Sequence, residues 1–197
     1  MRVVLADYGA GNLRSVASAL ARAGAEPVVS GDPVAVRAAP LVVIAGVGNI
    51  ASARPGLQPV AGALRDRVGS GRPLLGICVG LQLLFERSDE GGSGLGLLRG
   101  DVHRVRARTV PHMGWNGLVA ARPSALLDGL EGQDVYFAHS YAAEPLDDVA
   151  IALVEHDGPL VAVVESGPVA GVQFHPERSG GAGARFLANV LRWSRSA

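Results

Sequence analysis

The sequence has no lysine and only one cysteine among its 197 residues. All of its basic residues are arginine, so chemistry that starts from a lysine Schiff base is excluded. A single cysteine forms no disulfide within the chain, and it cannot complete a zinc site that needs two or four thiolates. A lone thiol is typical of a reducing compartment, so we expect a cytoplasmic protein.

Long apolar runs and an excess of one charge are missing as well. No segment reaches the ~18 apolar residues expected of a membrane span, and the apolar run in Met1–Asp7 is too short for a signal peptide. The 18 acidic residues balance the 18 basic ones, which provides no attraction to nucleic acid or to an anionic membrane. An apolar fraction of 48% predicts a globular chain, with one domain over residues 1–197.

Short apolar runs alternate with helical patterns in the first 90 residues. Strands are predicted at 2–6, 27–30, 41–45 and 73–77. Helices are predicted at 12–23, 57–68, 79–86 and, near the end of the chain, 183–193. Between 100 and 120, and again between 135 and 174, the pattern is short strands and turns with little helix. The expected fold class is therefore α/β, with a central and mostly parallel sheet flanked by helices and a mixed or antiparallel edge.

The cysteine lies in the segment Gly76-Ile77-Cys78-Val79-Gly80, where an apolar strand runs into a helix. A sharp turn of this kind, with small residues on both sides, is typical of a nucleophile elbow. The start of a helix favours the thiolate form, and the free N–H of Val79 can donate to an oxyanion. A lone cysteine is more often inert and buried, but this context favours a nucleophile. The segment leaves amidotransferase, hydrolase and peptidase chemistry open.

A cysteine nucleophile usually needs an oriented base. Among five histidines, only His175 has a carboxylate at a suitable spacing. It follows a predicted strand at 169–174, and Pro176 restricts its backbone to an extended conformation. Glu177 can then accept a hydrogen bond from the imidazole. We therefore predict a catalytic triad of Cys78, His175 and Glu177, and we interpret His112 and His139 as structural histidines.

These two segments together resemble class I glutamine amidotransferases. Within that family, four further segments are similar to the glutaminase subunit of imidazole glycerol phosphate synthase, which acts in histidine biosynthesis. They are residues 8–13, 46–48, 111–116 and 136–141. The resemblance runs from residue 4 to about residue 191. The segments around Cys78 and His175 are common to all branches of the family, whereas Pro111–Asn116 is specific to this one.

The resemblance implies that the Cys78 thiolate attacks the carboxamide of L-glutamine, while the N–H groups of Val47 and Val79 hold the oxyanion. It implies that ammonia passes to a (β/α)₈ cyclase subunit in a heterodimer, without metal or cofactor. The residues implied in glutamine binding are Gly46, Gly48, Gln82, Glu90, Ser140 and Tyr141. Those implied at the partner interface are Asn12, Trp115, Tyr136 and Arg178.

The sequence departs from the family pattern at three places. Ala45 stands where the family usually has proline, which gives the following loop more backbone freedom. Asn49-Ile50 replaces a common Ala-Phe pair, and Arg178 replaces lysine. An arginine keeps the charge for an ion pair with a partner but changes its geometry.

Other interpretations remain open at this point. Gly9-Ala10-Gly11 lacks the third glycine of a dinucleotide fingerprint. Asn12 is a candidate helix cap as well as an interface residue, and Trp115 could pack in a core rather than face a partner. The chain could also serve another amidotransferase branch, such as anthranilate or pyridoxal phosphate synthesis. A cysteine hydrolase or peptidase and a non-catalytic interaction module are the alternatives from other classes.

Overall fold

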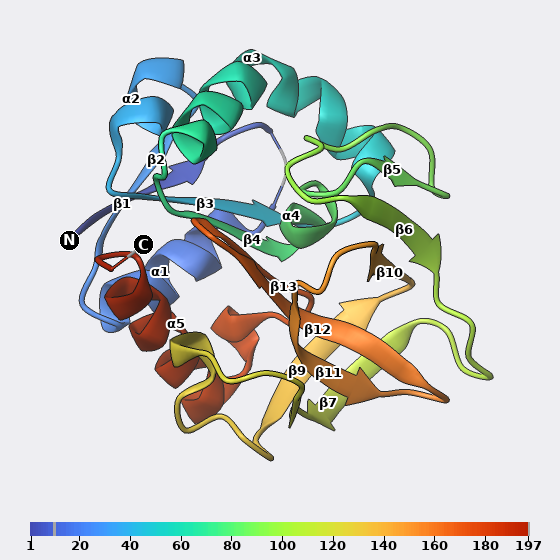
Figure 1. Ribbon diagram of the computed structural model, residues 1–197. Coiled ribbons are helices and arrows are strands. Elements are labelled where there is room, and N and C mark those ends of the chain that lie inside the picture. Colours follow the sequence, from blue (N-terminus) through green and yellow to red (C-terminus); the bar gives the residue numbers. More distant parts are fainter. Residues whose placement is uncertain (10, 197) are drawn as a thin grey trace.

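An eight-stranded sheet forms the centre of the computed structural model, which describes residues 1–9 and 11–196 (Figure 1). Ala10, in the predicted glycine-rich segment, lies outside the described residues. The strand order is β2-β1-β3-β4-β13-β12-β11-β8. The first five are parallel: β2 (Glu26–Ser30), β1 (Arg2–Ala6), β3 (Leu41–Gly46), β4 (Leu74–Cys78) and β13 (Val169–Val172). The last three are antiparallel: β12 (Pro159–Ser166), β11 (Ala150–Glu155) and β8 (Val119–Ala120). The predicted mostly parallel sheet with an antiparallel edge is thus confirmed.

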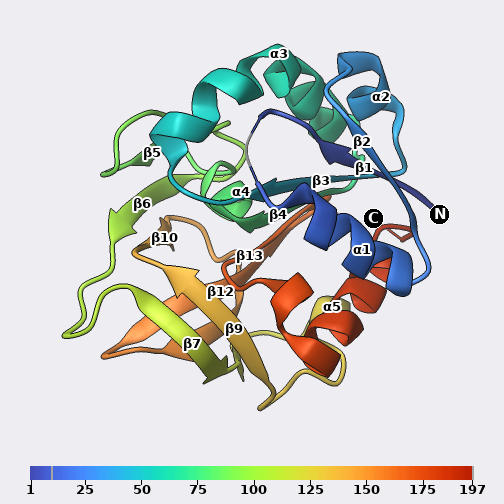
Figure 2. The ribbon, with the colours of Figure 1, turned by 180° about the vertical axis from the view of Figure 1, so that it is seen from behind.

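Helices cover both faces of the parallel half (Figures 1 and 2). One layer contains α2 (Pro33–Ala38) and α3 (Ile50–Gly69), and the other contains α1 (Leu13–Arg22) and α5 (Gly180–Trp193). Helix α1 buries its apolar stripe at Val16, Ala19 and Leu20, and it ends just before Gly24, whose φ of 92° only glycine adopts easily. The strands β3 and β4 are buried along their whole length, as expected of parallel strands between two helical layers.

Several predicted boundaries were wrong. Helix α3 begins at Ile50 rather than 57, where Asn49 caps its N-terminus by accepting from the backbone N–H of Ser52 at 2.7 Å. Helix α2 was missed, although Asp32 caps it in the same way and Pro33 opens it. Helix α4 covers only Val79–Gln82 instead of 79–86.

The shortening of α4 has a long-range cause. The backbone carbonyls of Leu83 and Leu84 accept hydrogen bonds from the N–H groups of Leu95 and Leu97, at 2.7 and 2.8 Å. These bonds pair the segment after α4 with a loop rather than with a next helical turn. The predicted strand 169–174 is also shorter, because β13 ends at Val172.

Two small sheets lie beside the antiparallel edge. One pairs β7 (His112–Gly117) with β9 (Asp134–His139). The other has the order β10-β6-β5, formed by Tyr141–Pro145, Gly100–Arg104 and Arg87–Ser88. Single 3₁₀ turns occur at Ala125–Leu127 (η1) and Pro176–Arg178 (η2). The prediction of short strands between 100 and 174 is confirmed, but part of them leaves the central sheet.

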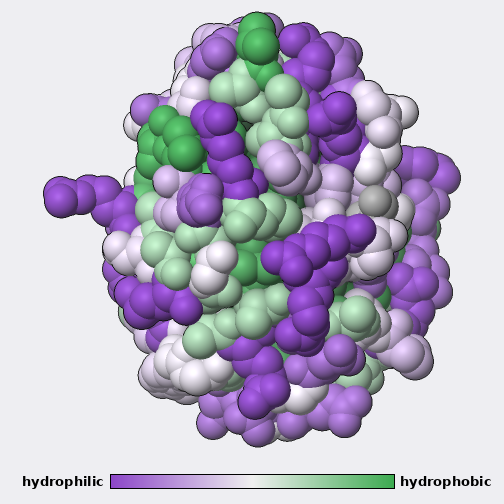
Figure 3. Space-filling model, turned by 90° about the vertical axis from the view of Figure 1, so that its left-hand side faces the viewer, coloured by the Kyte–Doolittle hydropathy of each residue, from purple (hydrophilic) through white to green (hydrophobic). Residues whose placement is uncertain are grey.

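None of the described helices is long and apolar enough to cross a membrane. On the side that carries α2 and the N-terminus, apolar areas are interrupted by hydrophilic side chains (Figure 3).

Candidate active site

Three neighbouring parallel strands bring the predicted catalytic segments together. In the registers of β3, β4 and β13, Gly46 lies opposite Cys78, and Ile77 lies opposite Val172. The loop after β3, the turn after β4 and the chain after β13 therefore leave the sheet at one edge. Parallel α/β sheets place their ligand sites at the carboxyl ends of their strands.

The turn at Cys78 is sharp and strained. Cys78 has φ 53° and ψ −109°, a left-handed conformation that non-glycine residues rarely adopt. A Cβ at Gly76 would lie 2.5 Å from the carbonyl oxygen of Gly80, and one at Gly80 would lie 1.9 Å from that of Ile44. Both glycines are thus needed for steric reasons. With only four residues, α4 has a smaller dipole than the predicted helix, but the N–H of Val79 at its start still lacks an intrahelical acceptor.

His175 is oriented by Glu177, as its Nδ1 lies 3.0 Å from the Glu177 Oε1. Their side chains are 8% and 2% exposed, so water screens this pair weakly. Burial alone lowers the pKa of His175, but hydrogen bonds with Cys78 and Glu177 and their negative charges outweigh it and raise the pKa to about 10. His175 therefore carries a proton at neutral pH.

The backbone around His175 is fastened to strand β9. The N–H of His175 donates to the carbonyl of Tyr136 at 2.9 Å, and the hydroxyl of Ser179 donates to the carbonyl of His175 at 2.7 Å. The Ser179 hydroxyl oxygen also accepts from the N–H of Tyr136 at 2.9 Å. These bonds hold the backbone of His175 against strand β9.

Cys78 and His175 open onto a cavity of about 300 Å³. This volume is at the small end of ligand pockets and suits a small metabolite. The predicted residues Val47, Gly48, Val79, Gln82, Glu90, Ser140, Tyr141 and Arg178 all line it. Gly46 and Glu177 do not: Gly46 is buried behind Val79, and Glu177 lies behind His175. Partial burial raises the pKa of Glu90, and the N–H of Ile50, which donates to its carboxylate at 3.2 Å, opposes that rise.

Two buried polar residues near Cys78 were missed. The amide nitrogen of Gln173 donates to the Cys78 Sγ at 3.6 Å. The hydroxyl of Tyr8 donates to the carbonyl of Ala45 at 2.9 Å, and burial, followed by the charge of Cys78, raises the pKa of Tyr8. Tyr8 thereby anchors the strand end where the family's proline is replaced. Gln173 could have been noticed because it is a polar residue in an apolar run.

Of the predicted interface residues, only Arg178 lines this cavity. Trp115, on β7, is 58% exposed, and its ring stacks edge-on to that of Tyr136 on β9, with the centroids 6.0 Å apart. The interpretation of Trp115 as a core residue is thus wrong. Asn12 occupies the N-cap position of α1, as predicted, but its side chain makes no capping hydrogen bond.

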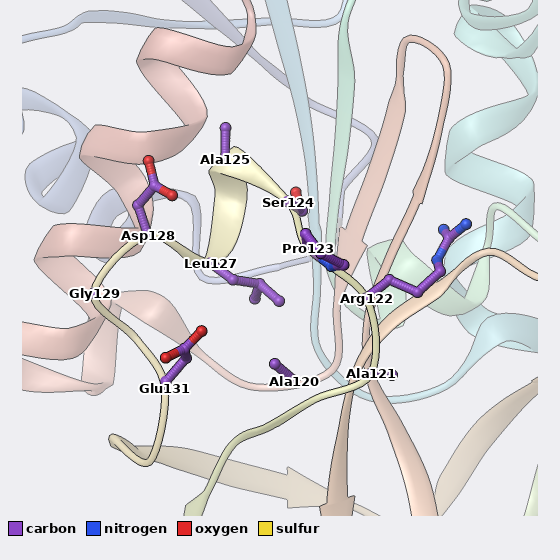
Figure 4. Close-up of a pocket in the computed structure, with 10 residues that line it drawn as sticks. All are labelled: Ala120, Ala121, Arg122, Pro123, Ser124, Ala125, Leu127, Asp128, Gly129 and Glu131. Atoms are coloured by element: carbon purple, nitrogen blue, oxygen red, sulfur yellow. The ribbon is translucent and has the colours of Figure 1, made fainter.

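A larger cavity of about 720 Å³ lies between β8 and η1 (Figure 4). The side chains around it include Arg122, Asp128 and Glu131, and it shares no lining residue with the cavity at Cys78. It contains no cysteine or histidine, so it offers no nucleophile–base pair. Among the described residues, no group of histidine, cysteine, aspartate or glutamate side chains could hold a metal ion.

Comparison with known proteins identifies the class. The family model described as glutamine amidotransferase class-I matches residues 4–192. Two solved structures share the fold: a glutamine amidotransferase (TM-score 0.79, 20% identity) and PurLQS from Thermotoga maritima (TM-score 0.77, 23% identity). Each alignment covers 98% of both chains. The chain therefore belongs to the class I glutamine amidotransferase family.

Curated relatives define the branch. The chain is 48% identical to imidazole glycerol phosphate synthase subunit HisH of Geobacillus kaustophilus, over 94% of this chain and 93% of that protein. It is 42% identical to HisH of Methanothermobacter thermautotrophicus, over 98% of this chain and the whole of that protein. With HisH of Rhodospirillum rubrum the identity is 47%, over 98% of this chain and 100% of the relative. These matches place the chain in the HisH branch and confirm the predicted glutamine amidotransferase of the imidazole glycerol phosphate synthase type.

Proposed function

We propose that the whole chain is one glutaminase domain, which hydrolyses L-glutamine with Cys78, His175 and Glu177 and passes the ammonia to a cyclase subunit for the synthesis of imidazole glycerol phosphate. One observation carries the proposal. Cys78 and the buried His175–Glu177 pair meet at the carboxyl ends of adjacent strands, beside a cavity lined by Gln82 and Glu90.

The first half of the reaction forms a thioester. The Cys78 sulfur bonds to the carboxamide carbon of glutamine, and the oxygen takes the negative charge, which the N–H groups of Val79 and Val47 stabilise. His175 holds a proton at neutral pH and gives it to the departing nitrogen, so the carbon–nitrogen bond breaks and ammonia leaves.

The second half restores the enzyme. His175, now neutral, takes a proton from water, and the resulting hydroxide attacks the thioester carbon. The carbon–sulfur bond breaks, glutamate leaves, and the Cys78 thiolate and the His175 imidazolium are regenerated. Glu177 keeps the imidazole in one orientation throughout, because its Oε1 accepts from Nδ1 and leaves Nε2 for the reacting atoms.

The amino-acid head of glutamine is assigned to the polar end of the cavity. Gln82 and Glu90 present oxygen acceptors suited to an ammonium group. The backbones of Gly48, Ser140 and Tyr141 complete the site, and Gly46 supports it from behind Val79. The partner surface is assigned to Asn12, Trp115, Tyr136 and Arg178, of which Trp115 is an exposed aromatic side chain typical of interfaces. The HisH relatives are named as subunits of imidazole glycerol phosphate synthase, which supports a cyclase subunit as the partner. The lone thiol of Cys78 is the reason to place this complex in the cytoplasm.

The test is glutamate production by the pure protein, alone and with a cyclase subunit of imidazole glycerol phosphate synthase and its ribonucleotide substrate. We expect strong stimulation by the partner, and loss of activity in Cys78→Ala and His175→Ala. His103→Ala is the matched control, because His103 is a partly exposed histidine that pairs with Asp89 and does not line the cavity. Glutamate production without stimulation would contradict the assigned partner, and no glutamate under any condition would contradict the mechanism.

A further inference from the structure

Two buried histidines outside the proposed triad lie side by side on β7 and β9. His112 and His139 are directly opposite in the strand register and are 3% and 6% exposed. The Nδ1 of His112 lies 2.9 Å from the Nε2 of His139. The chemistry described above uses neither ring, yet His139 lines the cavity at Cys78.

The neighbours of these rings determine which nitrogen carries each proton. The Nδ1 of His139 lies 2.9 Å from the carbonyl oxygen of Tyr141, which can only accept, so this nitrogen donates. In the neutral ring the Nε2 of His139 is then an acceptor, and the Nδ1 of His112 must donate to it. The Nε2 of His112 in turn accepts from the amide nitrogen of Asn116 at 3.2 Å. All three bonds therefore point the same way, from Asn116 towards Tyr141.

The direction of the Asn116 amide is fixed independently. Its nitrogen also lies 2.9 Å from the backbone carbonyl of Glu155, which can only accept. Its oxygen accepts from the N–H of Gly117 at 2.9 Å. A flipped amide would lose both of these bonds, so Asn116 presents a donor to His112.

The chain of hydrogen bonds continues beyond Tyr141 to the nucleophile. The same Tyr141 carbonyl accepts from the amide nitrogen of Gln82 at 2.8 Å. That nitrogen gives its other proton to the side-chain oxygen of Gln173 at 3.1 Å. The Gln173 nitrogen then donates to the Cys78 Sγ. Because both protons of the Gln82 amide are engaged, its oxygen is the atom left to bind a ligand.

We propose that Asn116, His112 and His139 are positioning residues for the glutaminase site, and that they act through the Tyr141 carbonyl on Gln82, Gln173 and the Cys78 thiol. The role in glutamine hydrolysis rests on the proposed function, whereas the hydrogen bonds that connect Asn116 to Cys78 do not. The three residues lie on β7 and β9, and β7 also bears the exposed Met113 and Trp115. A partner that binds to Met113 and Trp115 would therefore contact the strand that carries Asn116 and His112.

The rings must stay neutral for the chain to persist, and their surroundings favour this state. Burial, with a smaller contribution from the nearby His156, lowers the pKa of His112 to about 4. Burial also lowers the pKa of His139 to about 4, although its hydrogen bond with the Tyr141 carbonyl opposes this shift. His156 stacks on His112 with the ring centroids 4.2 Å apart, but its own Nε2 bonds to the carbonyl of Thr109 and takes no part in the chain. A substitution at His156 is thus a matched control, because its ring contacts His112 but makes none of the hydrogen bonds between Asn116 and Cys78.

The first test is the tautomeric state, measured by two-bond ¹H–¹⁵N correlation NMR of the intact protein at neutral pH. We expect His112 and His139 both to be neutral with the proton on Nδ1. A proton on Nε2, or a charged ring, at either position would overturn the proposal.

The second test uses the reactivity of Cys78, which is the only cysteine in the sequence. Alkylation by iodoacetamide as a function of pH reports the environment of the Sγ without any glutamine turnover. Asn116→Leu keeps the number and branching of the side-chain heavy atoms but has no donor. We expect it to change the alkylation rate or its pH midpoint and to raise the KM for glutamine about 3- to 10-fold, the range for one lost hydrogen bond. His156→Gln should leave both quantities within about 2-fold of the wild type.

A double-mutant cycle separates transmission from local damage. Along one connected chain, Asn116→Leu and Gln173→Met should be less than additive in their effects on alkylation, because either change interrupts the same path. Additive effects, or a loss of thermal stability in Asn116→Leu with unchanged alkylation and KM, would overturn the proposal. If the wild type makes no glutamate but alkylation responds as expected, the proposed function fails and the positioning chain stands.

Discussion

Two glycine-to-alanine substitutions of identical chemistry should have opposite effects in this protein. Gly80 follows the cysteine turn, and a Cβ there would lie 1.9 Å from the carbonyl oxygen of Ile44 and 2.8 Å from its carbonyl carbon. Both obstacles are backbone atoms of the central strand β3, so no side-chain rotation relieves them. Gly62 is an exposed residue inside helix α3, and a Cβ there would meet nothing within 4 Å.

The size of each effect follows from these distances. Ordinary contact begins at 3.4 Å, so Gly80→Ala must shift the start of α4 by more than 1 Å. Overpacking of this kind costs about 1–3 kcal/mol, or roughly 2–12 °C in Tm for a chain of this size. A displacement of ~1 Å at a reacting group lowers kcat/KM about 100-fold. Gly62→Ala should instead stabilise the helix by about 0.5–1 kcal/mol and raise Tm by about 1–4 °C.

The assay is thermal unfolding of both variants beside the wild type, followed by the glutaminase rate with the cyclase partner. We expect Gly80→Ala to melt lower and to lose activity, and Gly62→Ala to melt higher with full activity. If both variants shift Tm in the same direction, or if Gly80→Ala retains the wild-type kcat/KM, the steric explanation of the Cys78 turn is wrong.

Three further predictions concern charge. Glu177→Gln removes the negative charge beside His175, so the pKa of His175 should fall from about 10. We expect kcat to drop about 10²- to 10⁴-fold with little change in KM. An unchanged kcat in steady-state assays would contradict the assigned role of Glu177. Arg67 is fully buried and donates to the backbone carbonyls of Val36, Ala39 and Pro73, so Arg67→Met should lower the free energy of unfolding in urea by about 2–5 kcal/mol. Arg72 is exposed and makes one such bond, so Arg72→Met should lower it by less than about 1 kcal/mol. Equal losses of stability in the two variants would refute this explanation. The pKa of His139 is about 4 in the folded protein and about 6.5 when unfolded, so the unfolded chain binds more protons between these two pH values. As the pH decreases from 6.5 to 4, the free energy of unfolding should therefore fall by about 2–3 kcal/mol because of this residue. Urea titrations across that range should show a shallower pH dependence for His139→Gln, and an identical slope would count against a neutral buried ring.

Local signals predicted the elements whose residues interact with near neighbours in the chain. The strand, glycine and cysteine pattern around Cys78 identified the turn, because its steric demands act over a few residues. The sequence His175-Pro176-Glu177 likewise predicted the hydrogen bond between His175 and Glu177, because the two residues are close neighbours in the chain. The alternation of apolar runs and helical patterns was enough for the mostly parallel sheet and its antiparallel edge.

The errors arose where distant segments compete with local preference. The helix after Cys78 stops early because the carbonyls of Leu83 and Leu84 bond to residues 95 and 97 instead of the next turn. Asn12 occupies the N-cap position of α1, but its side chain makes no capping hydrogen bond. Gln173 and Tyr8 were not singled out, because their roles depend on Cys78 and Ala45, which are far away in the sequence.

The sequence by itself determined the class of fold and the family, and it predicted the nucleophile and the base, since each depends on residue types at short, regular spacings. Only the tertiary structure decided which polar groups surround the Cys78 sulfur and how the strand β7 connects to it. That connection passes through Asn116, His112, His139 and Gln82, which come from separate segments. A hydrogen bond needs its two atoms about 3 Å apart, and only the packing of β7 and β9 beside the central sheet brings these side chains so close.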